Sequence, residues 1–172
     1  MGSTHSRDVL LIGSCNESVD DQIYTKLKLY NFACKLKDKD HCMINFILPN
    51  GVEQQQQHTF QKLRVNKRKI QAVVLIVDCR ASREQLRSVE LVEHDLREFK
   101  EKPILIYLAN EHSSAKNHRQ LVTLEASEYV LQLSNRFTRA IVEPCCQVTG
   151  QGLFEGLDNL CSQLNINKCS VC

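Results

Sequence analysis

A glycine and a short polar stretch follow an apolar run near the start of the chain. The apolar run is DVLLI (residues 8–12), and the polar stretch is GSCNESVD (residues 13–20). A glycine between a buried strand and a helix is typical of loops that bind nucleotide phosphates. The phosphate-loop pattern requires a glycine, four residues and then Gly-Lys-Ser/Thr. Gly13 fits this pattern. The last three positions of the pattern hold other residues, namely Ser18, Val19 and Asp20.

These three residues change the chemistry of the loop. Val19 has no charge with which to neutralise phosphate oxygens, and Ser18 makes close approach of a ligand to the backbone harder than glycine would. Asp20 adds negative charge where phosphates would lie, and like charges at close range repel by on the order of a few kcal/mol. A carboxylate is also an accepted Mg²⁺ ligand, so Asp20 leaves a divergent nucleotide site open as an alternative.

The elements that must position this loop alternate between strands and helices. Helical spacing of apolar residues predicts helices over Ser82–Lys100, Lys116–Leu133 and Gly152–Leu164, with Thr149 as the N-cap of the last. The segment Asn31–Leu48 is predicted to form two antiparallel strands around a KDKD turn at 37–40. Five short apolar runs predict strands: Asp8–Gly13, Cys42–Leu48, Ala72–Asp78, Pro103–Asn110 and Ala140–Cys146. This order predicts an α/β fold with a mostly parallel sheet, whose ligands bind at the carboxyl ends of the strands.

Composition is that of one ordinary globular domain. The chain has 172 residues, 42% hydrophobic residues and a net charge of +2, and no apolar stretch is long enough to span a membrane. The segment 49–69 is predicted to be a long polar loop; its basic end lacks interleaved aromatic residues, so no nucleic-acid partner is expected. The nine cysteines are expected to be buried free thiols. A zinc site would need four converging ligands, and the sequence does not display them.

Several stretches together resemble the ADP-ribosylation-factor (Arf and Arf-like) family of small GTPases. The clearest is TGQGLFEGLDNL within residues 139–164, supported by AVVLIVDCRASREQL, ILIYLANEHSSAKN and the loop GSCNESVD. The resemblance implies one Ras-like small-GTPase domain over residues 1–172, with short tails at 1–7 and 165–172. It also implies a mostly parallel six-stranded sheet with one antiparallel hairpin strand and helices on both faces. The chain would be a divergent member with degenerate nucleotide motifs.

The resemblance places the guanine-reading residues, and these are altered as well. The family's Asn-Lys-x-Asp becomes Asn110-Glu111-His112-Ser113, and its Cys-Ala-Thr becomes Cys146-Gln147-Val148. Loss of the carboxylate that binds guanine removes a contact of roughly 1.5–3 kcal/mol. The resemblance thus leaves pocket remnants at Gly13, Asp20, Asn110 and Cys146. The positions where it shows the motif lost are Ser18, Val19, Glu111, Ser113 and Gln147.

These observations predict a pseudo-GTPase that acts as a non-catalytic, protein-binding adaptor in vesicle trafficking or membrane organisation. No cofactor and no metal are expected; the alternative is a divergent GTP-binding switch that uses GTP or GDP with magnesium. Partners would bind through the hairpin and the 49–69 loop of a monomeric, cytoplasmic protein. Peripheral contact with an internal membrane would involve two lipidation candidates. These are Gly2 in MGSTHS, which fits the myristoylation pattern, and Cys169 in the terminal KCSVC.

Overall fold

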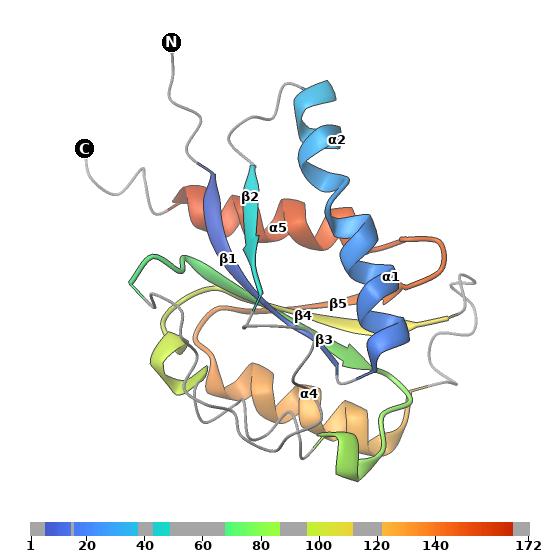
Figure 1. The fold of residues 1–172 in the computed structure, drawn as a ribbon. Coiled ribbons are helices and arrows are strands. Elements are labelled where there is room, and N and C mark those ends of the chain that lie inside the picture. Colours follow the sequence, from blue (N-terminus) through green and yellow to red (C-terminus); the bar gives the residue numbers. More distant parts are fainter. Residues whose placement is uncertain are drawn as a thin grey trace.

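Five parallel strands and the helices that cover them make up the described part of the chain (Figure 1). The structure is a computed structural model that describes residues 6–14, 16–37, 43–48, 68–86, 96–111 and 122–166. The strands are β1 (Arg7–Ile12), β2 (Ile44–Ile47), β3 (Ala72–Asp78), β4 (Ile104–Asn110) and β5 (Ala140–Cys146). The helices are α1 (Glu17–Leu27), α2 (Tyr30–Leu36), the short 3₁₀ helix η3 (Arg97–Phe99), α4 (Leu124–Arg136) and α5 (Leu153–Ile166).

The strand order is β2-β1-β3-β4-β5, and every neighbouring pair is parallel. All seven residues of the central strand β3 are buried, as expected for a strand covered on both faces. Apolar side chains of α1, α2 and α5 form the core on one face of the sheet, and those of α4 and Phe99 form the core on the other. Figure 1 shows these two layers on opposite sides of the strands. The predicted α/β class is therefore confirmed.

The predicted hairpin over Asn31–Leu48 is wrong in the described residues. The first half is the helix α2, and β2 pairs with β1 in parallel. Tyr30 and Cys34, four residues apart, are buried on the inner face of α2, so the apolar spacing here is helical. The Asn31 side chain fixes α2 to β2, because its amide nitrogen donates to the Ile44 carbonyl (2.7 Å) and its oxygen accepts the Ile44 N–H (2.8 Å). The described residues hold five strands rather than the six that were predicted.

Two of the three predicted helices correspond to helices of the structure. The last one is confirmed as α5, which continues to Ile166 and so enters the predicted tail, as β1 does at Arg7. The prediction for Lys116–Leu133 corresponds to α4, which begins later because the Thr123 hydroxyl caps it by accepting the Ala126 N–H (3.1 Å). Of the helix predicted over Ser82–Lys100, residues 87–95 lie outside the described residues. So does the 49–69 loop apart from residues 68–69. No helix of the described part is long and apolar enough to cross a membrane.

Candidate functional site

The carboxyl ends of β1 and β3 form the natural ligand position in this sheet. The chain passes from β1 to β2 on one side and then to β3 on the other, so the strand order reverses between β1 and β3. In open parallel sheets, ligands bind in the crevice at such a reversal. The loop 13–16 follows β1 at this point, and the last residue of β3, Asp78, lies beside it. The sequence prediction of a site at GSCNESVD therefore falls at the topologically favoured place.

The Asp20 carboxylate occupies this loop. Its Oδ1 atom accepts hydrogen bonds from the Ser14 backbone N–H and from the Ser14 hydroxyl, both at 2.7 Å. A Cβ atom on Gly13 would lie only 2.8 Å from the Asp20 Cγ and closer still to Oδ2, so the carboxylate sits directly against the glycine. The Ser14 hydroxyl in turn accepts the Asn16 N–H (3.3 Å). Gly13 makes room for a side chain of the chain itself.

Burial raises the pKa of Asp20 above its ordinary value of 3.8. The two hydrogen bonds from Ser14 oppose this shift, and the neighbouring carboxylates of Asp21 and Asp78 add to it. The loop thus concentrates acidic groups where a phosphate-binding loop needs cations and N–H donors. A second anion at this place would meet unfavourable charge as well as an occupied amide.

Asp78 is closed off in the same way. The carboxylate is buried, with 5% of the residue exposed. Its Oδ2 accepts the Asn16 side-chain amide (2.9 Å), and its Oδ1 accepts the Arg80 backbone N–H (2.9 Å). The Arg80 guanidinium lies 3.5 Å from Oδ1 and forms an ion pair with Glu111 at 2.9 Å. The Asp78 carboxylate is therefore already bound by groups of the chain itself.

Val19 and Ser18 both lie in the first turn of α1, but their side chains point in different directions. Val19 is 1% exposed and belongs to the core between α1, α5 and the sheet, whereas Ser18 is exposed. The position expected to carry a phosphate-binding lysine therefore points into the core. The donors described at this loop do not fit magnesium and a nucleoside triphosphate, because Val19 stands at the expected lysine position and the carboxylates of Asp20 and Asp78 are already hydrogen-bonded.

The segments expected to contact a guanine base are also joined to each other. The Gln147 backbone N–H donates to the carbonyl of Asn110, the last residue of β4 (2.9 Å), which extends the β4–β5 ladder one residue past the end of β5. Gln147 is 2% exposed, and its side-chain oxygen has no hydrogen-bond partner among the described residues. Glu111 turns toward Arg80 instead of toward this region. Ser113, Gly2 and Cys169 lie outside the described residues.

Cys146 lies at the end of β5 in a hydrogen-bonded turn. Its thiol contacts the Glu111 carbonyl (3.5 Å) and accepts the Thr149 N–H (3.3 Å). Burial would raise the pKa of this thiol, but the hydrogen bonds from Thr149 and Val148 and the charge of Lys26 outweigh it, and the pKa is lowered. The described cysteines, 34, 79, 145, 146 and 161, are all buried and form no disulfide, as predicted. No group of three or more metal-ligating side chains converges in the described part of the chain.

The glycines of TGQGLFEG are explained by local packing. Gly150 and Gly152 have positive φ angles (82° and 86°), which L side chains rarely adopt. A Cβ on Gly152 would also collide with the Pro144 carbonyl, and one on Gly156 would lie 2.8 Å from the Tyr107 ring. Thr149 is not the N-cap of α5: its hydroxyl accepts the Gln151 N–H (3.3 Å), which closes the turn before the helix begins.

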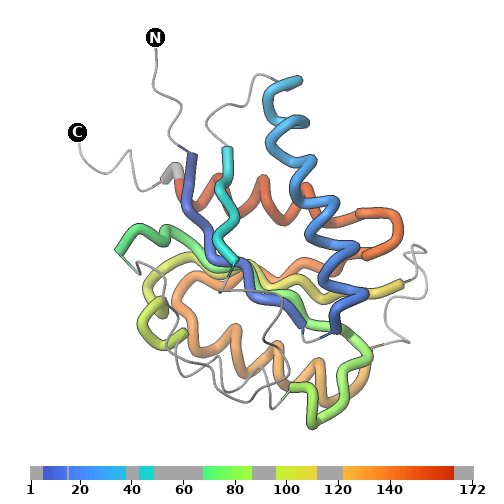
Figure 2. Tube along the Cα trace, viewed as in Figure 1, coloured from blue at the N-terminus to red at the C-terminus, as the bar shows by residue number. Residues whose placement is uncertain are grey.

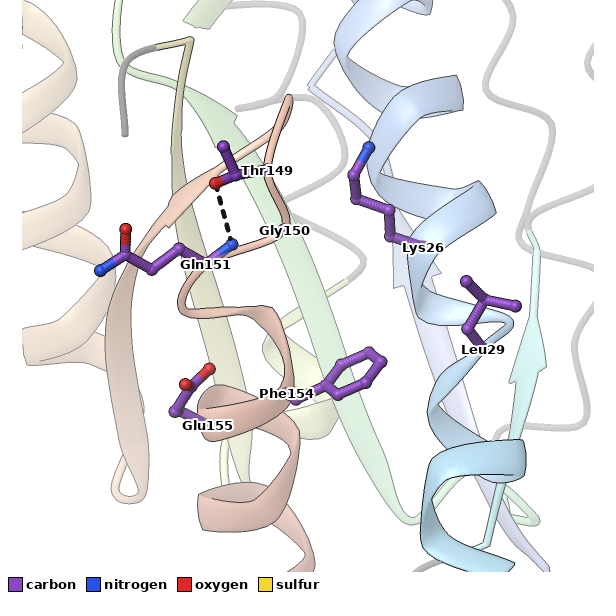
Figure 3. Close-up of a pocket in the computed structure, with 7 residues that line it drawn as sticks. All are labelled: Lys26, Leu29, Thr149, Gly150, Gln151, Phe154 and Glu155. Atoms are coloured by element: carbon purple, nitrogen blue, oxygen red, sulfur yellow. Dashed lines mark hydrogen bonds between the residues drawn. The ribbon is translucent and has the colours of Figure 1, made fainter. Parts of the chain in front are cut away.

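A groove of about 700 Å³ runs between the α1–α2 junction and the start of α5. Lys26 and Leu29 form one wall, and Phe154 points toward them from α5 (Figure 3). The remaining lining residues are Thr149, Gly150, Gln151 and Glu155. None of the predicted site residues lines this groove, which is separate from the loop that Asp20 fills.

Sequence reasoning missed Ser14, Asn16, Asp78 and Arg80 as members of the site. Two signals were available. Asp78 directly follows a continuous apolar strand, and Asn16 stands immediately before a helix, where its side chain is free to reach a neighbouring strand end. The pairing of Arg80 with both Asp78 and Glu111 depends on the parallel register of β3 and β4, which spacing alone does not reveal.

Comparison with known proteins shows the fold. No family model and no curated protein matches the chain. Among solved structures it is similar to the crystal structure of nucleolar GTP-binding protein 1 from Plasmodium falciparum, with a TM-score of 0.58 and 11% sequence identity over 98% of this chain and 91% of that one. The chain thus has an α/β fold that matches a P-loop GTPase fold, with a parallel five-stranded sheet.

Proposed function

We propose that this chain is a pseudo-GTPase, a GTPase-fold domain that neither binds nor hydrolyses GTP and acts as a protein-binding adaptor. The observation that carries the proposal is the Asp20 carboxylate hydrogen-bonded within the loop after β1. Loop amides of this kind bind phosphate in nucleotide sites. Here the Ser14 amide is bound to a carboxylate of the same chain, so a phosphate would have to displace it.

The other parts of the loop support the same proposal. The buried Val19 supplies no cation, and the Asp78 carboxylate beside the loop is hydrogen-bonded within the chain. The Gln147 backbone N–H already donates to the Asn110 carbonyl. Among the described residues, the expected lysine is replaced by Val19, and the N–H groups of Ser14 and Gln147 are paired inside the chain, which favours a scaffold held in one conformation.

The cellular setting rests on the sequence alone. The resemblance of TGQGLFEGLDNL to the Arf family suggests a role in vesicle trafficking or membrane organisation for a cytoplasmic monomer. Partners would bind through the segments 31–48 and 49–69. Lipidation at Gly2 or Cys169 would add peripheral contact with an internal membrane.

The test is the nucleotide content of protein purified natively with magnesium. The protein is denatured, the supernatant is separated by ion exchange, and fresh protein is titrated with fluorescent GTP and GDP. We expect no guanine peak and no binding at micromolar protein. A guanine peak near one per protein, or saturable binding of magnesium-GTP, would show that the proposal is wrong.

A divergent GTP-binding switch is the second candidate, because the fold matches that of a GTP-binding protein and Gly13 and Asn110 keep their places at two strand ends. It predicts GTP hydrolysis that responds to Asp20→Ala, since that substitution clears the loop. Hydrolysis that is the same in the wild type and in this variant would identify a contaminating enzyme.

A further inference from the structure

An exposed apolar stripe runs along the outer face of the α1–α2 junction and α2. It consists of Leu29, Phe32 and Leu36, which are 58%, 63% and 73% exposed. Residues three and seven apart lie on one face of a helix, so the three side chains form a continuous line, called here the α2 stripe. Figure 2 shows that α1 leads directly into α2, and the Ala33 N–H donates to the Leu29 carbonyl (3.0 Å), so the line is not interrupted.

The inner face of the same helix is already used. The Tyr30 hydroxyl donates to the Asp158 carboxylate (2.8 Å), and its ring packs edge-on against Phe154 at 5.6 Å between centroids. Cys34 is 3% exposed on the same side. The α2 stripe is therefore not needed to attach α2 to the domain, and its exposure of large apolar side chains calls for a covering partner.

Lysines border the α2 stripe on both sides. At about 100° per residue, Lys28 and Lys35 fall on one side of the stripe and Lys26 and Lys37 on the other. Residues 22–37 contain these four lysines and no Asp or Glu. Lys28, Lys35 and Lys37 are exposed, and Lys26 is half-buried over Gly150. The stripe thus has a positive border, which complements an apolar surface bordered by carboxylates.

The α2 stripe opens at one end into the groove of about 700 Å³. Leu29 belongs to both, and Phe154 and the Lys26 stem form the apolar part of the groove (Figure 3). Glu155 and Gln151 lie on the far wall and supply polar groups. A row of apolar anchors that ends in a hollow is suited to an inserted helix, as in helix-in-groove recognition.

From this geometry we infer that the α2 stripe and its groove bind an amphipathic helix of a partner protein, with apolar residues at i, i+3 or i+4 and i+7 flanked by Asp and Glu. This inference rests on the proposed adaptor function and names the surface and the class of partner. A second copy of the chain would bring two lysine borders together, which repel. A flat lipid surface would leave the groove empty and the Glu155 carboxylate without a contact.

The experiment is selection of helical peptides from a displayed library against the full chain, followed by affinity measurements on the enriched peptides. We expect acidic amphipathic helices to be enriched. Phe32→Glu with Leu36→Glu should weaken their binding about tenfold or more, because both substitutions place carboxylates in the apolar contact. The matched control is Leu124→Glu with Leu131→Glu on α4, two side chains that are equally exposed (71% and 62%) and seven residues apart.

The lysine border is tested with the same peptides. Lys28→Glu with Lys35→Glu should weaken binding several-fold and reduce its dependence on salt, and Lys100→Glu, away from α2, should leave both unchanged. Peptides in which every Glu and Asp is replaced by Lys should bind the reversed variant better than the wild type. Enriched peptides that are insensitive to the α2 substitutions, or no enrichment at all, would overturn the inference.

Two further measurements separate the possible failures. Sedimentation with phosphatidylserine vesicles that is abolished by the α2 substitutions, without peptide binding, would assign the stripe to a membrane and overturn the inference. Fluorescent GTP is titrated into the same preparations. Nucleotide binding alongside peptide binding would refute the pseudo-GTPase proposal and leave the docking surface standing. If neither nucleotide nor peptide bound, the docking surface would be refuted and the pseudo-GTPase proposal would stand.

Discussion

The loops after β1 and after β5 lie at the same edge of the sheet but are built from opposite kinds of residue. After β1, polar side chains fill the space: Asp20 binds Ser14, and Asn16 binds Asp78. After β5, glycines keep the backbone tight, with Gly150 and Gly152 at positive φ. The first loop departs from the nucleotide-site pattern, and the second keeps the pattern that resembles a GTPase family.

The difference teaches what each pattern does in the molecule. The β5–α5 glycines are required by the chain itself, because Gly152 packs against the Pro144 carbonyl and Gly156 against the Tyr107 ring. A lysine and a threonine after β1 would be required only by a bound nucleotide. A sequence that folds in this way without nucleotide would retain the β5–α5 glycines and would not retain the lysine and threonine after β1. This is the combination found here.

The largest effect is expected for Gly152→Ala. The new Cβ would meet backbone atoms that cannot move aside, and φ of 86° is unfavourable for alanine, so we expect a loss of about 3–5 kcal/mol in the free energy of unfolding. Gly150→Ala is the matched control: it has a similar φ, but its Cβ would meet only the flexible Lys26 stem at 3.1 Å. It should lose only about 1–2 kcal/mol. Urea unfolding followed by circular dichroism measures both, and equal losses would show that backbone packing is not the cause.

Restoring the missing cation is expected to damage the fold instead of creating a nucleotide site. Val19 is 1% exposed in the core, so Val19→Lys would bury a charge among apolar side chains and lower the free energy of unfolding by about 2–4 kcal/mol. Val19→Ile, which keeps the position apolar, is the control. A stable lysine variant that gained affinity for fluorescent GTP would show that the loop after β1 still has the geometry of a nucleotide site.

Asp20 tests whether the filled loop depends on hydrogen bonds or on charge. Asp20→Asn retains an oxygen acceptor for Ser14, whereas Asp20→Ala leaves the Ser14 N–H and hydroxyl without their acceptor. We expect the alanine variant to be less stable than the asparagine variant by about 1–3 kcal/mol in urea unfolding. Two variants of equal stability would mean that the loop does not rely on this contact.

The pH dependence follows from the raised pKa of Asp20. The folded protein binds this proton more tightly than the unfolded chain, so the wild type loses stability relative to Asp20→Asn as the pH rises from below 3.8 through the raised pKa. Above that window the difference should be constant. Unfolding midpoints of both proteins across this range check the sign, and a difference that moved in favour of the wild type would contradict the role of burial.

The strands were predictable from the sequence because burial on both faces leaves an uninterrupted apolar run. Ala72–Asp78 is both the predicted and the observed strand. The helix α5 was predictable for a similar reason, since one wide apolar stripe faces the core. The segment 31–48 was not, because a helix of seven residues offers only two buried positions, and what fixes it is the contact of Asn31 with a distant strand.

The site was only half predictable. Sequence motifs located Gly13, Asn110 and Gln147 at strand ends and Asp20 shortly after the first strand, but they could not show that Asp20 turns back onto Ser14 or that Gln147 pairs with Asn110. Those contacts depend on side-chain direction and on the register between strands. The α2 stripe was hidden for a related reason: a strand would place Phe32, Cys34 and Leu36 on one face, and only a helix separates the exposed Phe32 and Leu36 from the buried Cys34.

The smallest expected effect concerns the hydroxyl beneath the β5–α5 block. The buried Tyr107 hydroxyl donates to the Leu153 carbonyl, and Tyr107→Phe removes this bond while keeping the ring, so we expect a loss of about 0.5–1.5 kcal/mol. Tyr24→Phe, on a half-buried ring that contacts Lys28 through its face, is the control and should change little.

A Cβ on Gly156 would lie 3.0 Å from the Tyr107 hydroxyl oxygen as well as against the ring. Gly156→Ala should therefore be less damaging in the Tyr107→Phe background than in the wild type. Unfolding free energies of the four proteins test this coupling, and strict additivity would mean that Gly156 and Tyr107 are independent and that the glycine has a purpose other than packing.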